Sequence, residues 1–76
     1  MAHLVLVRHG EPDYSGVTAR GYIGHGQDLA PLTEAGIAQA EAAAGDARLS
    51  GASLIVSSPY TRALQTAAII SRKTGI

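Results

Sequence analysis

Residues 4–11 read Leu-Val-Leu-Val-Arg-His-Gly-Glu, and this stretch sets the expectations for the rest of the chain. Four consecutive aliphatic residues, two of them β-branched, form a run that is too short for a helix and typical of a buried strand. The run gives way at once to a cation, an imidazole and a glycine. Because open α/β sheets bind ligands at the carboxyl ends of their strands, we expect a binding site at this point.

The three residues that end the run each suit the binding of an anion. His9 can act as a nucleophile when its imidazole is neutral, and Arg8 offers a planar, permanently charged fork that fits phosphate. Gly10 allows the backbone to turn sharply or to approach a ligand closely. Together they predict an oxyanion site with a nucleophilic imidazole. His3, at the other end of the run, is interpreted as a structural residue.

Composition excludes several classes of protein. The chain has 76 residues, so it forms one small domain or part of a larger one with a marginal core. It has no cysteine, and three tyrosines are its aromatic residues, so the expected core is aliphatic. Six basic residues balance six acidic ones without a basic block, which argues against nucleic acid or an anionic membrane as partner. No signal peptide or membrane-spanning segment is recognised, so a cytoplasmic location is expected.

The remaining pattern alternates between strand and helix. We predict a strand over 3–8, a loop over 11–31, a helix opened by Thr33 and running to about 48, a strand over 52–57 and a helix over 59–73. Ser58 is the expected N-cap of the second helix, and Gly75 is its expected C-cap. A strand joined through a helix to another buried strand predicts a right-handed parallel crossover.

The crossover would bring two cationic segments together. Both strands would end at the same sheet edge, so Ser57, Ser58 and Arg62 would lie beside residues 8–10. Helix N-termini bind anions and arginine binds phosphate through two hydrogen bonds, which favours a phosphate site. The 11–31 loop would cover this site, and Arg20 and His25 in it could reach the substrate, although the pattern somewhat favours solvated loop residues for both.

Four blocks of the sequence, in this order, resemble the histidine phosphatase superfamily, whose phosphoglycerate-mutase-like enzymes carry an Arg-His-Gly motif. The blocks are residues 4–11, residues 24–28, residues 31–36 with 39–40, and residues 57–67. The resemblance implies that His9 is the nucleophile that becomes phosphorylated and that Arg8 and Arg62 bind the phosphoryl oxygens. Ser15 stands where the family often has an asparagine that also touches phosphate. The resemblance implies no metal and no cofactor.

The resemblance covers nearly the whole chain, which we expect to be the N-terminal part, residues 1–76, of one incomplete domain. The expected fold is α/β, a three-layer αβα sandwich with a mainly parallel sheet, of which this chain supplies about the first half as strand, loop, helix, strand and helix. Two parallel strands need neighbouring strands and helices, so we expect a completing chain segment or a homo-oligomer.

Three functions remain open from the sequence. The first is a phosphomonoester hydrolase that forms a phosphohistidine on His9 and acts on a small phosphorylated substrate, with phosphoglycerate-mutase-type transfer as a variant of the same chemistry. The second is a non-catalytic phosphate-binding fragment, because the family's second histidine and acidic proton donor are not recognised in this chain. Glu11, Asp13 and His25 are weak candidates for those roles. The third is a purely structural fragment.

Overall fold

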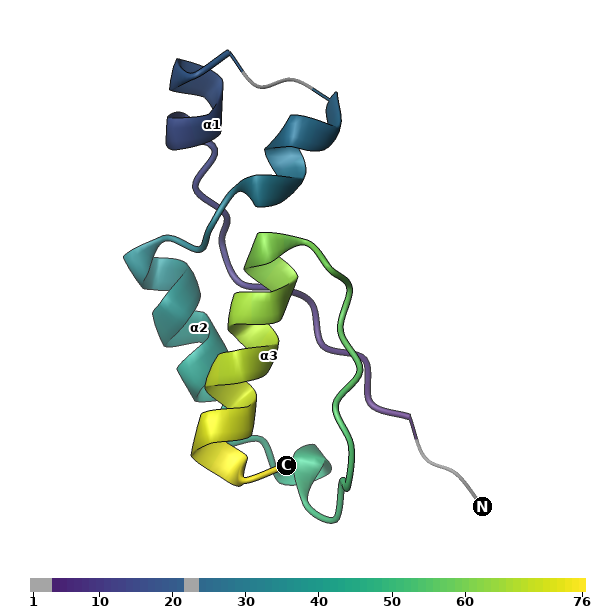
Figure 1. Cartoon of the computed structure of the whole chain (residues 1–76). Helices are drawn as coiled ribbons and strands as arrows, with labels where there is room; N and C mark the ends of the chain where they lie inside the picture. Colours follow the sequence, from purple (N-terminus) through teal and green to yellow (C-terminus); the bar gives the residue numbers. More distant parts are fainter. Residues whose placement is uncertain (1–3, 22–23) are drawn as a thin grey trace.

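The computed structural model describes residues 4–21 and 24–76, and these residues form helices joined by extended segments (Figure 1). In chain order the elements are α1 (Ser15–Ala19), the 3-10 turn η1 (Gly24–Leu29), α2 (Glu34–Ala44), the 3-10 turn η2 (Ala47–Leu49) and α3 (Thr61–Thr74). Helices α2 and α3 pack side by side, and η1 contacts both α1 and α3. The chain is flat and elongated, with extents of 45 × 24 × 15 Å.

Local capping decides where α2 begins and ends. The hydroxyl of Thr33 accepts a hydrogen bond from the Gly36 amide at 2.9 Å, so the predicted N-cap is confirmed. The helix ends at Ala44 rather than near residue 48, because Gly45 follows as C-cap. Asp46 then caps the separate turn η2, where its carboxylate accepts from the Arg48 amide at 2.8 Å.

Helix α3 begins two residues later than predicted. Tyr60 has extended backbone angles and serves as N-cap without a side-chain bond, while the Ser58 hydroxyl accepts from the Tyr60 amide at 3.2 Å just outside the helix. At the other end, Gly75 adopts the left-handed region with φ at 80° and its amide donates to the Ser71 carbonyl. The predicted glycine C-cap is therefore confirmed.

The predicted sheet is absent from the part of the chain that the structure describes. No strand forms there, and the β-type pairing present is an isolated antiparallel bridge between Pro12 and Leu32. The prediction of strands over 3–8 and 52–57 was therefore wrong. The α/β class and the three-layer αβα sandwich, which depended on those strands, were wrong too. Leu6 and Val56 are 86% and 85% exposed, which also contradicts the burial that their apolar runs predicted. His3 lies outside the described residues.

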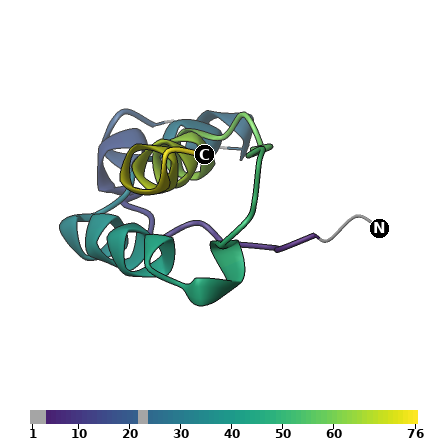
Figure 2. The same ribbon diagram turned by 90° about the horizontal axis from the view of Figure 1, so that it is seen from below.

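The reason is that a strand is stabilised by its neighbours rather than by its own sequence. Residues 4–7 are exposed on both faces, and the 52–58 segment follows a different direction instead of running alongside (Figure 2). Parallel strands are stable in sheets whose two faces are covered, and two strands alone are marginal. The short apolar runs have the composition of strands. They do not form a sheet here because they do not pair with neighbouring strands.

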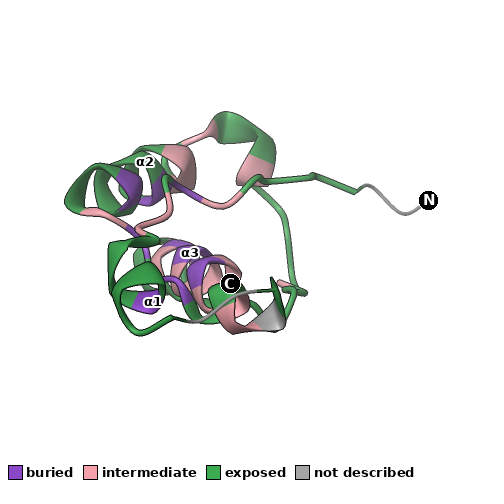
Figure 3. Cartoon of the chain, turned by 90° about the horizontal axis from the view of Figure 1, so that it is seen from above, coloured by how far each residue is buried: buried purple, intermediate pink, exposed green. Residues whose placement is uncertain are grey.

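The packed centre is formed by residues of α1, α2, α3 and the segment that leads into α2 (Figure 3). Its buried apolar residues are Val17, Ala30, Leu32, Ala40 and Ile70. Two buried polar residues of α3, Arg62 and Thr66, face the same centre. Within the described residues, no helix is long and apolar enough to cross a membrane.

The 11–31 segment is not a featureless loop, because it contains α1 and η1. Its two ends are joined by backbone hydrogen bonds, from Asp13 to the Pro31 carbonyl at 2.7 Å and from Thr33 to the Glu11 carbonyl at 2.9 Å. These hydrogen bonds therefore hold the two ends of the segment side by side.

Two glycines bring the Arg-His-Gly segment against α2. A β-carbon at Gly10 would overlap the backbone of Gly36, and a β-carbon at Gly36 would overlap the backbone of Glu11. Both glycines are buried. This backbone-to-backbone crossing fixes the position of the residues that follow the apolar run, and it requires glycine at both positions.

Candidate active site

His9 is half-buried immediately before this glycine crossing, and both of its ring nitrogens have partners. Nδ1 lies 2.7 Å from the Gly10 carbonyl oxygen, and Nε2 lies 3.3 Å from Nε of Arg62. A carbonyl can only accept and a guanidinium can only donate, so Nδ1 carries the proton and Nε2 presents its lone pair. The contacts thus make Nδ1 the donor to the Gly10 carbonyl and Nε2 the acceptor of the Arg62 N–H.

Arg62 reaches His9 from the first turn of α3, and its position is fixed by three further groups. Its guanidinium carbon lies over the ring of Tyr60, 4.8 Å from the ring centre, and over the ring of Tyr14, 5.6 Å from the ring centre. Nη1 donates to the Gln27 carbonyl in η1 at 3.3 Å. The bonds to His9 and Gln27 use two of the five guanidinium N–H groups.

A buried threonine connects the backbones of the two site segments. The Thr66 hydroxyl donates to the Arg62 carbonyl at 2.8 Å and accepts from the Gly10 amide at 3.2 Å. The side chain is 4% exposed. Thr66 lies one helical turn after Arg62, so it shares a face of α3 with that arginine.

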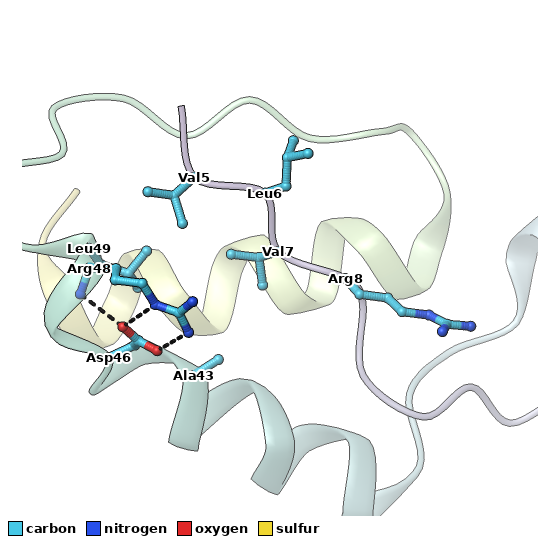
Figure 4. Close-up of a pocket in the computed structure, with 8 residues that line it drawn as sticks. All are labelled: Val5, Leu6, Val7, Arg8, Ala43, Asp46, Arg48 and Leu49. Carbon is cyan, nitrogen blue, oxygen red and sulfur yellow. Dashed lines mark hydrogen bonds and ion pairs between the residues drawn. The ribbon is translucent and has the colours of Figure 1, made fainter. Parts of the chain in front are cut away.

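Arg8 borders two depressions in the surface. One, of about 250 Å³, is lined by Arg8, His9, Gly10, Glu11, Pro12 and Gln39. The other, of about 210 Å³, lies between the apolar run and η2 (Figure 4). In Figure 4 the Arg8 side chain points away from the Asp46–Arg48 ion pair of that second pocket. The structure therefore places Arg8 and His9 on the wall of one pocket.

Glu11 is bound by the N-terminal part of α2. Its carboxylate accepts from the Thr33 hydroxyl at 2.9 Å, and its amide donates to the Gln39 side chain at 2.8 Å. These contacts give Glu11 a structural task, which is to hold the Arg-His-Gly segment on the helix.

Ser15 and Arg20 lie at the two ends of α1 and are exposed. Both the amide and the hydroxyl of Ser15 donate to Asp13, the hydroxyl at 2.6 Å, and these hydrogen bonds lower the pKa of the Asp13 carboxyl. The His25 backbone belongs to η1, but its side chain lies outside the described part of the structure. The structure thus joins His9 to Arg62 and leaves Ser15 and Arg20 on the surface.

Sequence reasoning missed the residues that hold Arg62 in place. Tyr14 and Tyr60 are two of the three aromatic residues of the chain, and each is close in sequence to a predicted site residue. Because aromatic residues are scarce in this chain, their proximity to site residues could have indicated a role in the site. Thr66 could have been found from its four-residue spacing to Arg62. In the described part of the chain no cluster of histidine and carboxylate side chains could hold a metal ion.

The site thus brings the imidazole of His9 into contact with the buried Arg62. The sequence model of the Histidine phosphatase superfamily (branch 1) matches residues 4–76, and the chain belongs to this superfamily. Two relatives from Yersinia pestis (strain Pestoides F) and Yersinia pseudotuberculosis (serotype O:1b) are named probable phosphoglycerate mutase GpmB. Each is 42% identical over 76 residues, which is 100% of this chain and 34% of the relative.

The chain thus spans about a third of the length of the curated relatives that it matches. The search of solved structures found no match.

Proposed function

We propose that this chain carries the nucleophile and a phosphate-binding arginine of an enzyme that transfers phosphoryl groups through a phosphohistidine. The observation that carries the proposal is the 3.3 Å contact between Nε of Arg62 and Nε2 of His9. It places a fixed positive charge beside the atom that would attack phosphorus. Phosphoryl transfer depends mainly on alignment and on stabilising the equatorial oxygens, and these two residues supply both.

The reaction has two steps. Nε2 of His9, released from its hydrogen bond as the Arg62 guanidinium turns to the phosphoryl oxygens, attacks phosphorus, the bond between phosphorus and the ester oxygen breaks, and the leaving alkoxide takes up a proton from water. Water then attacks the phosphohistidine, the bond between nitrogen and phosphorus breaks, and inorganic phosphate leaves with the imidazole neutral again. The Nδ1–H bond to the Gly10 carbonyl, at 2.7 Å, stabilises the positive charge that the ring gains in the first step. The guanidinium of Arg62 would bind the phosphoryl oxygens.

Arg8 is the second proposed phosphate ligand, since it lines the same pocket as His9. Ser15 is a weaker proposal, because its hydroxyl donates to Asp13 at 2.6 Å and would have to leave that bond to reach phosphate. Arg20 and His25 stay predictions for substrate contact. The bond from Arg62 to the Gln27 carbonyl supports a role for the η1 turn beside the substrate. The cytoplasmic location also stays a prediction.

Hydrolysis and mutase-type transfer share the first step and differ in the acceptor. In a mutase the phosphohistidine returns its phosphoryl group to a second hydroxyl of the substrate rather than to water. The names of the relatives favour phosphoglycerate as a candidate substrate. Phosphorus NMR with 3-phosphoglycerate separates the two reactions, because hydrolysis yields free phosphate and mutase transfer yields 2-phosphoglycerate.

The test of the proposal uses p-nitrophenyl phosphate, whose leaving group needs little protonation. The protein is quenched in base and analysed for an acid-labile, base-stable phosphate on His9 by mass spectrometry. We expect His9→Ala to abolish this phosphate and Arg62→Lys to slow its formation by roughly a hundredfold, because lysine lacks the planar fork. Arg72→Lys, on the same helix and exposed, is the matched control and should leave the rate unchanged.

Two results would decide against the proposal. Labelling that survives His9→Ala would place the nucleophile elsewhere. Saturable binding of inorganic phosphate by calorimetry, without any labelling of His9, would reduce the site to phosphate binding alone.

A further inference from the structure

The hydroxyl of Thr66 lies at the junction of the two segments that form the site, and both of its hydrogen bonds go to backbone groups. It donates to the Arg62 carbonyl at 2.8 Å and accepts from the Gly10 amide at 3.2 Å. The Gly10 carbonyl in turn accepts from Nδ1 of His9 at 2.7 Å. With the bond from Arg62 to Nε2, four hydrogen bonds form a closed circuit through Arg62, Thr66, Gly10 and His9.

We propose that Thr66 is a positioning residue for His9, and that its hydroxyl holds the imidazole in the tautomer that leaves Nε2 unprotonated. This inference rests on the proposed function of His9 but concerns a residue that touches no substrate. The amide that Thr66 binds belongs to the peptide group between His9 and Gly10. The Gly10 carbonyl, which is the acceptor for Nδ1–H, belongs to the next peptide group, whose Glu11 amide donates to Gln39 at 2.8 Å. The bonds to Thr66 and Gln39 together fix the peptide groups on both sides of Gly10 and so the direction of its carbonyl.

Because the Gly10 amide is buried, its orientation depends on the hydrogen bond to Thr66. Gly10 is buried and Thr66 is 4% exposed, so water cannot readily replace the hydroxyl as acceptor. A buried amide without an acceptor is costly, and the peptide would rotate to find another partner. The Gly10 carbonyl would then be held on one side alone, through the Glu11 amide and Gln39, and its bond to Nδ1 would weaken. The two tautomers of His9 would become closer in energy as a result. A tautomer with the proton on Nε2 has no lone pair for the attack on phosphorus.

The same helix provides a matched control. Thr74 donates to the Ile70 carbonyl at 2.7 Å and accepts from the Ile76 amide at 3.2 Å, which is the bonding pattern of Thr66. Thr74 lies at the C-terminal end of α3, two helical turns beyond Thr66 and away from His9. Thr→Val at either position removes one hydroxyl of the same geometry and keeps the shape of the side chain. A difference in tautomer or rate between the two variants is therefore due to where the hydroxyl lies, because both variants lose a hydroxyl with the same bonding pattern.

The experiment measures the tautomer and the chemistry separately. Long-range proton–nitrogen NMR on the protein labelled with ¹⁵N-histidine identifies which nitrogen of His9 carries the proton. We expect Nδ1–H in the wild type, Thr66→Ser and Thr74→Val, and a mixture of tautomers in Thr66→Val. We also expect Thr66→Val to slow phosphohistidine formation roughly ten- to a hundredfold, since small misplacements of a reacting group have such effects. The dissociation constant for inorganic phosphate should stay unchanged.

Several outcomes would overturn the inference. These are a wild-type tautomer and rate in Thr66→Val, an equal change in Thr74→Val, or loss of the Nδ1–H tautomer in Thr66→Ser. Should Thr66→Val fail to fold, hydrogen exchange in the wild type decides, because rapid exchange of the Gly10 amide would show that Thr66 does not hold it. If the wild type forms no phosphohistidine, the proposed function fails, while the tautomer and exchange measurements still decide the role of Thr66.

Discussion

Replacing Gly36 by alanine should weaken the fold, although the same change strengthens most helices. In a helix interior Gly→Ala normally stabilises by about 1 kcal/mol. Here the added β-carbon would overlap the backbone of Glu11, because the Arg-His-Gly segment crosses α2 at this residue. The overlapping atoms belong to main chain rather than to a flexible side chain, so the segment itself must move.

The size of the expected loss of stability follows from the contacts that this movement disturbs. Overpacking costs about 1–3 kcal/mol. Two hydrogen bonds of Glu11 are at risk, the one from the Thr33 amide at 2.9 Å and the one to Gln39 at 2.8 Å. Each contributes about 0.5–1.5 kcal/mol. After subtracting the gain in helix propensity, we expect a net loss of about 3 kcal/mol in the free energy of unfolding.

Urea unfolding followed by far-UV circular dichroism measures this loss, with Gly45→Ala as the control. Gly45 is the C-cap of α2 and has φ at −85°, and a β-carbon there would meet its nearest neighbour at 3.5 Å, an ordinary contact. The control should change stability by less than about 0.5 kcal/mol. A Gly36→Ala variant that is as stable as the wild type, or more stable, would refute the argument that the glycine crossing holds the site segment on α2.

Two further predictions concern charges. Hydrogen bonds from the side chain and the backbone amide of Arg48 lower the pKa of Asp46 from 3.8 to about 2, so this carboxylate favours the folded state above pH 4 and stops doing so as the pH falls through 2. Arg48→Ala removes the side-chain bonds but keeps the amide, so it should raise the pKa of Asp46 part of the way back towards 3.8 in a carbon NMR titration, and a value still near 2 would contradict this. Tyr60→Leu removes the nearer aromatic face of Arg62 and should weaken binding of inorganic phosphate about two- to fivefold by calorimetry. Tyr14→Leu should have the smaller effect of the two, and unchanged affinity in both variants would exclude a role for the stacking.

The sequence predicted the neighbourhood of His9 and Arg62 but attributed it to the wrong cause. The prediction relied on two parallel strands ending at one sheet edge. In the structure the two residues meet because Gly10 crosses α2 at Gly36 and because α2 packs against α3. Glycines at both points of the crossing were visible in the sequence, but nothing in a single chain indicates that two distant glycines touch.

Helix boundaries were predictable wherever a cap acts locally. Thr33 and Gly75 are caps in the structure because each bonds to groups within four residues of itself. The sheet was not predictable in the same way, since strands depend on partners that are distant in sequence. Leu6 and Val56 are residue types that favour strands, but both are exposed and lack the neighbouring strands that would stabilise a sheet.

The hydrogen bonds that the described residues make in the site run to groups outside the apolar runs. His9 donates to the Gly10 carbonyl and accepts from Arg62, and Glu11 is held by Thr33 and Gln39. None of these partners lies in residues 4–7 or 52–56. A residue of the apolar run can therefore change its environment while Nε2 stays beside the guanidinium, provided that the glycine crossing and the Thr66 bond persist. The position of His9 is thus set by contacts with two helices and one short segment, which is why variants at Gly36 and Thr66 test it more directly than variants in the apolar run.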